Sequence, residues 1–454
     1  MARFRETNSF ALFPISQVSP NLWRNELRSL YFQPPKVPQT FGASLILIIN
    51  DIRELAKAGS LSLCYTRCML DLKEYGIEMW PEEKIQAFRK ALLDWYDANK
   101  RDLPWRRTKD PYAIWVSEIM LQQTRVDTVI PYYERFLYHL PTISDLAQAP
   151  EEVILKLWEG LGYYSRVRNM QKAAQQMVED FDGQFPTTHA AISSLKGIGP
   201  YTAGAISSIA FNLPEPAVDG NVMRVLSRLF EVDYDIGLPA NRKIFQAMME
   251  LLIDPERPGD FNQALMDLGS DIESPVNPRP QDSPVKAFSA AYLNGTMDKY
   301  PIKAPKKKPI SVAYQGFLIR NKDNQFLLEK NNEAGLLSGF WSFPLLEKGA
   351  IVDKQVSLFE VAEEVVQPDI RQSFTELYGL AVDWQEQEFG IVQHIFSHRK
   401  WQIEMVEGVA ETLNLPESKE LKWVSVEDFP TYPFAKPQQK MWENFIKEKE
   451  KQKS

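Results

Sequence analysis

The stretch Leu195-Lys196-Gly197-Ile198-Gly199-Pro200-Tyr201-Thr202-Ala203 joins two predicted helices through a turn that contains two glycines. Glycine adopts positive φ angles and lets another backbone approach closely. The free N–H groups of such a turn, with the start of the outgoing helix, suit one phosphate group. The alternative is a plain helical hairpin. Two glycines around one apolar residue, with Ala203 at the packing position, favour the phosphate site.

Working outward from this hairpin, helical patterning extends from about residue 81 to 300, with apolar residues at spacings of three and four. Residues 110–124 are predicted to form one of these helices. After a basic stretch the period changes, and residues 311–320, 325–330, 389–397 and 401–410 are predicted as strands, with a hairpin turn at 321–324. Residues 367–378 are predicted as a helix. The fold class is therefore multi-domain, an all-α domain followed by an α+β domain.

The expected boundaries follow these changes of pattern. Residues 1–68, broken by Pro34, Pro35 and Pro38, are expected to be a poorly structured extension that is dispensable, with Met69 as an alternative start. We expect a helical domain at 69–300, a basic linker at 301–310, an α+β domain at 311–445 and a charged, frayed tail at 446–454.

Composition limits the class of protein. The 454 residues carry a net charge of −8, which argues against nucleic-acid binding over the whole surface but not against a local basic face. Two clusters of positive charge occur, at residues 100–109 and 303–308, and either alone is more typical of a solvated loop. The two cysteines, Cys64 and Cys68, cannot build a disulfide framework, which fits a reduced cytoplasm. No stretch predicts a membrane span or a secretory signal.

Two carboxylates are candidates for acid–base chemistry. Glu118 shares a helical stripe with Ile114, Trp115 and Leu121, and desolvation there would raise its pKa. The equally weighted alternative is a glutamate that reaches solvent at the edge of the stripe. Asp219 begins an amphipathic helix, whose dipole favours its ionised form, although most such aspartates are simple caps. Together they form the acid and the anion that cleavage of a glycosidic bond requires.

Four segments carry a resemblance to a known family: 115–124, Gly160-Leu161-Gly162-Tyr163-Tyr164, 195–201 and Val218-Asp219-Gly220-Asn221. In this order they resemble the adenine DNA glycosylases of the MutY family, within the helix-hairpin-helix glycosylase superfamily. The likeness covers about residues 81–445. It implies a helix-hairpin-helix glycosylase domain followed by a Nudix-like domain.

The resemblance also implies roles for individual residues. Glu118 would protonate adenine, and Asp219 would stabilise the sugar cation or bond to it, supported by Tyr201 and Asn221. Arg106 would line the adenine pocket, Gly197 and Gly199 would bind phosphate, and Gln123 and Tyr163 would wedge into the duplex. Without the resemblance, Tyr163 and Tyr164 would be assigned to an aromatic core. The related endonuclease III has lysine at the position of Tyr201, so base removal without efficient strand cleavage is expected.

The C-terminal segment resembles the Nudix-like domain that the family shares with MutT. The helix Arg371 to Gly379 lacks paired glutamates, so magnesium chemistry is not expected. Phe396-Ser397-His398 matches the family's loop that senses 8-oxoguanine; taken singly, each residue would be assigned to a strand edge.

One departure from the family concerns its 4Fe-4S cluster, held by cysteines spaced C-x6-C-x2-C-x5-C. This chain has Glu273, Pro280, Ser283 and Ser289 in register with them. Because such clusters need thiolates, we expect no cluster, no other metal and no cofactor.

The sequence therefore predicts a base excision repair glycosylase, a monomer in the cytoplasm at the bacterial nucleoid, without membrane contact. Its partner would be double-stranded DNA with adenine opposite 8-oxoguanine or guanine. A thymine–guanine mismatch glycosylase is the alternative within enzymes, since some of these also combine tyrosine and aspartate. Outside the enzymes, the alternative is a non-catalytic DNA-binding module. The presence of both Glu118 and Asp219 argues against that alternative.

Overall fold

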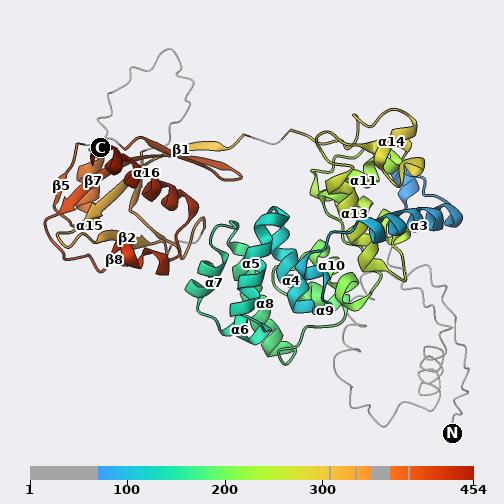
Figure 1. Ribbon diagram of the computed structural model, residues 1–454, viewed down its shortest axis with the longest axis horizontal. Coiled ribbons are helices and arrows are strands. Elements are labelled where there is room, and N and C mark those ends of the chain that lie inside the picture. Colours follow the sequence, from blue (N-terminus) through green and yellow to red (C-terminus); the bar gives the residue numbers. More distant parts are fainter. Residues whose placement is uncertain (1–69, 306–307, 333–334, 349–368, 387–388, 454) are drawn as a thin grey trace, which may run out of the picture. The chain divides into compact units, whose positions relative to one another are not determined.

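The structure is a computed structural model that describes residues 70–305, 308–332, 335–348, 369–386 and 389–453. The expectations for residues 1–68 and for a start at Met69 lie outside these ranges. The described chain begins with helices and continues with a mixed sheet (Figure 1). The expected fold class, a helical domain followed by an α+β domain, is confirmed.

The helical part consists of short helices joined by turns. In chain order they are α3 (Glu82–Asn99), α4 (Pro111–Leu121), α5 (Val126–His139), α6 (Ile143–Gln148), α7 (Glu151–Trp158), α8 (Ser165–Asp180), α9 (His189–Ser194), α10 (Pro200–Phe211), α11 (Gly220–Phe230), α12 (Arg242–Leu252), α13 (Pro258–Asp271) and α14 (Ala290–Leu293). The predicted helix at 110–124 is α4, and Asp110 caps it by accepting from the backbone N–H groups of Tyr112 and Ala113.

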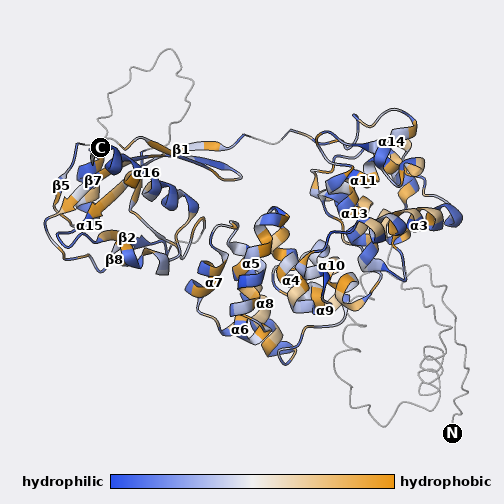
Figure 2. Cartoon of the chain, in the orientation of Figure 1, coloured by the Kyte–Doolittle hydropathy of each residue, from blue (hydrophilic) through white to orange (hydrophobic). Residues whose placement is uncertain are grey.

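Two hydrophobic cores divide these helices. The first draws mainly on residues 103–217 and has α4 and α10 packed against each other near its centre. The second combines α11, α12 and α13 with α3 from the beginning of the described chain. Helix α3 is amphipathic, with both hydrophilic and hydrophobic residues visible along it, and it buries Ile85, Phe88 and Leu92 (Figure 2). The residues at the junction of the two cores line the site described below.

The sheet of the C-terminal domain has the described strands β1 (Ile310–Arg320), β2 (Phe326–Lys330), β3 (Trp341–Ser342), β4 (Leu345–Glu347), β5 (Val382–Trp384), β6 (Ile391–Ile395), β7 (Arg399–Ala410) and β8 (Leu421–Val424). The central pair, β1 and β7, is parallel, whereas the other pairings are antiparallel. Alternate residues of β1 face opposite sides. Leu318 packs in the core that includes α16 (Lys436–Lys453), while Phe317 and Ile319 pack in the core that includes α15 (Ile370–Tyr378).

The predicted strands and the hairpin at 321–324 correspond to β1, β2, β6 and β7. The short strands β3, β4, β5 and β8 were not predicted, because two to four residues carry too little alternation. The tail expected to fray from residue 446 is helical as far as Lys453, as the end of α16. Among the described residues, no helix has the length and apolar character needed to cross a membrane.

Candidate active site

A cavity of about 210 Å³ lies where the two helical cores meet. The first core contributes Glu118 from α4 and Tyr201 from α10, and the second contributes Asp219, Asn221 and residues of α13. Two carboxylates far apart in the sequence thus line one cavity. The fold therefore places Glu118 and Asp219, which the sequence predicted to act together, on the same cavity.

Glu118 is buried, with 7% of its surface exposed. This excludes the alternative of a glutamate that reaches solvent. The pKa of Glu118 is raised to about 7. Burial is the largest cause and nearby Asp219 adds to it, whereas the Tyr201 hydroxyl and Arg106 oppose the shift. A carboxyl group with this pKa can hold a proton near neutral pH and deliver it to a base.

Asp219 caps helix α11 and lines the cavity as well. Its Oδ1 accepts from the backbone N–H of Val222 at 2.7 Å, and its Oδ2 accepts from the Asn221 amide at 2.8 Å. The backbone N–H groups at the helix start do lower its pKa, but the expected net lowering is wrong. Burial raises the pKa of Asp219 and outweighs these hydrogen bonds and the charge of Arg224. Both carboxyl groups are thus desolvated.

Tyr201 contacts the other carboxyl group of the cavity. Its hydroxyl donates to Glu118 Oε2 at 2.7 Å, because α10 packs against α4, and its expected support of Asp219 stays a prediction. Asn221 supports Asp219 as expected. The other end of the Asn221 amide accepts from Arg224 at 2.7 Å, and Arg224 Nε donates to the carbonyl of Glu273 at 2.7 Å. A chain of contacts therefore connects the loop at residue 273 with Asp219.

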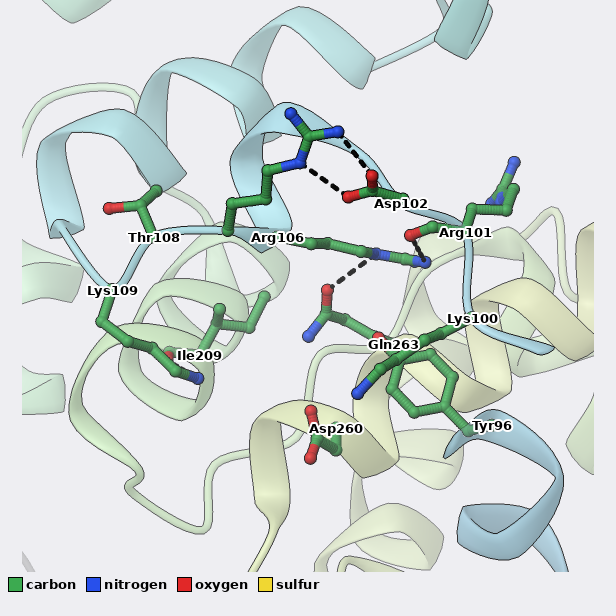
Figure 3. A pocket seen from close by; sticks show the side chains of 11 residues that line it. Tyr96, Lys100, Arg101, Asp102, Arg106, Thr108, Lys109, Ile209, Asp260 and Gln263 are labelled. Atoms are coloured by element: carbon green, nitrogen blue, oxygen red, sulfur yellow. Dashed lines mark hydrogen bonds and ion pairs between the residues drawn. The ribbon is translucent and has the colours of Figure 1, made fainter. Parts of the chain in front are cut away.

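Arg106 lines the cavity, as expected, and is held firmly. Its guanidinium donates to Asp267 at 2.8 and 3.0 Å, to Gln263 Oε1 at 3.1 Å and to the Arg101 carbonyl at 3.4 Å. Figure 3 shows Arg106 between Gln263 and Arg101. Asp267 is only 2% exposed and also pairs with Arg101. Two residues of the basic cluster at 100–109, Arg101 and Arg106, are thus fixed in the wall of the cavity, so the cluster is not only a solvated loop.

The glycine hairpin lies at the start of α10. Gly197 has φ +77°, and a Cβ there would meet the Asn169 side chain at 2.6 Å, so this position requires glycine. Gly199 has φ −90° and caps α10 without a side-chain partner; a Cβ there would meet nothing within 4 Å. Gly199 therefore leaves open space before the helix N-terminus instead of supplying an unusual backbone angle. Both features suit an incoming phosphate.

The two predicted wedge residues share an unusual backbone conformation. Gln123 has φ +60° and Tyr163 has φ +48°, in the left-handed region that non-glycine residues seldom occupy. Gln123 is exposed, and Tyr163 is 44% exposed. From the sequence alone, an aromatic core remained the alternative for Tyr163 and Tyr164. That alternative fits Tyr164, which packs against the first core, but it does not fit Tyr163.

The loop that follows β6 carries the three predicted sensing residues. The hydroxyls of Tyr163 and Ser397 share a hydrogen bond of 2.6 Å. Phe396 packs edge-on against His394 and Trp401, so it supports the loop from the sheet side. His398 follows in the turn before β7 and is exposed. The structure thus brings Tyr163 and Ser397 together.

The residues in register with the family's cluster ligands do not fit an iron–sulfur cluster. Glu273 is buried and already paired with Arg228 at 3.1 Å, Pro280 has no donor atom, and Ser289 Oγ donates to the Arg228 carbonyl at 3.1 Å. Ser283 is buried as well. A carboxylate in an ion pair and two hydroxyls cannot replace four thiolates.

Several residues of the site were not predicted from the sequence. Gln263, Met266 and Asp267 line the cavity from one face of α13, and Arg224 and Arg228 hold the loop from α11. The spacing of positions 263, 266 and 267 could have indicated these site residues, because it places three non-aliphatic side chains on one face of a helix. The two arginines of the amphipathic helix α11 gave a second signal.

Two family models match the chain. Residues 116–252 match the HhH-GPD superfamily base excision DNA repair protein, and residues 315–444 match the NUDIX domain. The first match lies within the helical part and the second within the C-terminal domain.

The chain is also similar to proteins named adenine DNA glycosylase. It is 33% identical to that of Homo sapiens over 405 residues, covering 77% of this chain and 72% of the human protein. It is 31% identical to that of Schizosaccharomyces pombe, and the match covers 79% of this chain and 88% of the yeast protein. The identity to that of Arabidopsis thaliana is 37%, covering 72% of this chain and 58% of the plant protein, less than two thirds of it.

Proposed function

The chain belongs to the adenine DNA glycosylases, base excision repair enzymes that hydrolyse N-glycosyl bonds, and we propose that its substrate is adenine opposite 8-oxoguanine or guanine in double-stranded DNA. The observation that carries this proposal is the pairing of Glu118 and Asp219 on one cavity. Acting on nucleoid DNA, the enzyme would work as a monomer in a bacterial cytoplasm.

The site supplies the groups that this hydrolysis needs. Glu118 transfers its proton to a ring nitrogen of the extruded adenine, so the bond to C1′ of the sugar breaks with its electron pair on the neutral base. Ionised Asp219 stabilises the oxocarbenium-like sugar, held by Asn221 and by the N–H of Val222. Water then adds its hydroxyl to C1′, and the proton that it loses restores protonated Glu118.

One assay tests the substrate. Purified protein is incubated with duplexes containing adenine opposite 8-oxoguanine, adenine opposite guanine, or a guanine–thymine mismatch, and base release is measured after alkaline cleavage. Release of adenine from the first two duplexes, and none from the third, is the expected result. Release of thymine would favour the mismatch glycosylase, and binding without release would favour a DNA-binding module.

The pH profile of base release provides a prediction from Glu118. The proton that it transfers is present below its pKa of about 7 and absent above it. The single-turnover rate should therefore fall as pH rises through about 7, by about tenfold per unit well above it. A rate that stays constant from pH 6 to 9 would contradict a proton-donating role for Glu118.

We infer that the enzyme lacks an efficient strand-cleaving step, because Tyr201 has no amine. Tyr201→Lys should introduce nicking through an imine between the lysine and C1′ of the abasic sugar. Borohydride trapping of the protein on abasic duplex measures that imine, with Tyr201→Phe as the matched control. Trapping of the wild-type protein as strong as that of the lysine variant would show that the inferred lack is wrong.

We propose that Ser397 contacts the base opposite adenine. In the full chain, Ser397→Ala should reduce the preference for adenine opposite 8-oxoguanine over adenine opposite guanine by about 5- to 100-fold, the effect of one lost hydrogen bond. Single-turnover rates on the two duplexes measure this ratio. Ser311→Ala changes an exposed serine of the same domain and serves as the control. An unchanged ratio would remove Ser397 from lesion sensing.

We also propose that the enzyme works without an iron–sulfur cluster. In its place, Arg228 holds the loop through the Glu273 carboxylate and through the carbonyls of Glu273, Ser274 and Tyr300. Protein produced under anaerobic, iron-rich conditions should be colourless and free of stoichiometric iron, yet should still excise adenine. About four irons per active chain would overturn this proposal.

A further inference from the structure

A second cavity, here called the rear cavity, adjoins the catalytic cavity. Its volume is about 200 Å³, close to the 210 Å³ of the catalytic cavity. Four residues line both cavities: Arg101, Arg106, Ile209 and Gln263. The two spaces are therefore separated by a partition one side chain thick, and each has room for the same small molecule.

Two helices show that the cavities lie one behind the other. Along α13, Asp260 lines only the rear cavity, Gln263 lines both, and Ser270 lines only the catalytic cavity. At 1.5 Å per residue, Asp260 and Ser270 lie about 15 Å apart along the helix. Along α10, Tyr201 lines the catalytic cavity and Ile209 both. The glycine hairpin precedes Tyr201, so the proposed DNA-binding side is opposite to the rear cavity.

This arrangement bears on a step that follows bond cleavage. Under the proposed function, on which this inference rests, the base enters the catalytic cavity attached to its sugar, from the side of the hairpin. After cleavage the abasic sugar still occupies that entrance. We propose that the excised purine leaves past Gln263 into the rear cavity, and from there to solvent, while the abasic DNA remains bound.

Gln263 is the part of the partition that can move with the smallest loss of contacts. Arg106 is fixed by Asp267, by the Arg101 carbonyl and by Gln263 itself. Gln263, in contrast, has one bond from Arg106 at 3.1 Å and donates one to the Gly259 carbonyl at 3.2 Å. Rotation of the Gln263 side chain opens the partition between the cavities and leaves the contacts of Arg106 to Asp267 intact.

The rear cavity has the chemistry to receive a neutral purine. The ring of Tyr96 forms part of its wall, and Lys100 and Thr108 offer donors (Figure 3). Asp260, whose Oδ2 accepts from Arg257, offers its other carboxylate oxygen. Ring nitrogens of a purine accept hydrogen bonds, and an exocyclic amino group donates them. The lining therefore offers a free base an aromatic face beside Tyr96 and donors for its ring nitrogens, to which Arg107 and Lys109 add.

The test separates base release from DNA release. Duplex DNA carries ¹⁴C in the target adenine and ³²P on the strand, and the enzyme is in excess so that the abasic product stays bound. Nitrocellulose retains the protein–DNA complex, while free adenine passes through. In the wild type, ¹⁴C should pass the filter at the rate of bond cleavage while ³²P is retained.

Two variants block the rear cavity from different sides. Lys100→Trp and Thr108→Trp place an indole in it, and neither residue lines the catalytic cavity. In each, ¹⁴C release should become at least about tenfold slower than cleavage. Glu179→Trp adds the same side chain to the exposed surface of α8, away from the rear cavity, and should behave as wild type.

The outcomes are distinct. Retention of ¹⁴C by the wild-type complex until the DNA dissociates would overturn the rear exit, and so would blocked variants that release base as fast as they cleave. Each variant is judged by its ratio of release to cleavage, so a partial loss of activity does not affect the result. Absence of alkali-labile product in the wild type would instead refute the proposed function.

Discussion

Glu118→Gln should abolish base release and leave DNA binding nearly unchanged. Glutamine keeps the shape of the side chain and its hydrogen bond with Tyr201, but it has no proton to transfer to the leaving base. General acids contribute about 10²- to 10⁴-fold, and we expect the upper end here, because Asp219, a second carboxyl group of the cavity, is proposed to act in its ionised form beside the sugar. Single-turnover release of adenine measures the effect, and a mobility shift on the same duplex measures binding.

Stability provides a control for Glu118→Gln. Since the folded protein raises the pKa of Glu118 from 4.5 to about 7, ionising this group costs native stability as pH rises through that range. The variant should match the wild type near pH 4 and exceed it by about 3 kcal/mol above pH 8. Near-normal release from a folded variant would remove Glu118 from its role as the acid.

Glu273→Ala should destabilise the helical domain by about 3 kcal/mol, the lower end of the cost of breaking a buried ion pair. Arg228 is only 4% exposed, and the substitution leaves its charge without a counter-ion. The backbone carbonyls around Arg228 keep the loss from being larger. Urea unfolding followed by circular dichroism measures the change.

Two further variants identify the cause of this loss. Glu273→Gln keeps an acceptor for Arg228 and should restore part of the stability. Asp282→Ala removes the exposed pair of Asp282 with Arg279 in the same loop and should change stability by less than about 1 kcal/mol. Equal losses from Glu273→Ala and Asp282→Ala would show that the buried pair does not hold the loop.

The sequence was sufficient to predict local features. The hairpin at 195–201, the helix at 110–124 and the strands β1 and β7 depend on neighbouring residues, and all were found where expected. The contact of Tyr201 with Glu118 was not predicted, because it depends on how α10 packs against α4. The direction of the pKa shift of Asp219 was mistaken, because burial by distant segments outweighs the effect of its own helix.

The contacts from Glu273 through Arg224 and Asn221 to Asp219 have a thermodynamic consequence. Free-energy coupling between two sites is reciprocal. If an ordered loop helps to hold Asp219 in place, then whatever fixes Asp219 must order the loop by the same amount. If this coupling holds, the order of the loop at Glu273 rises and falls with occupancy of the catalytic cavity.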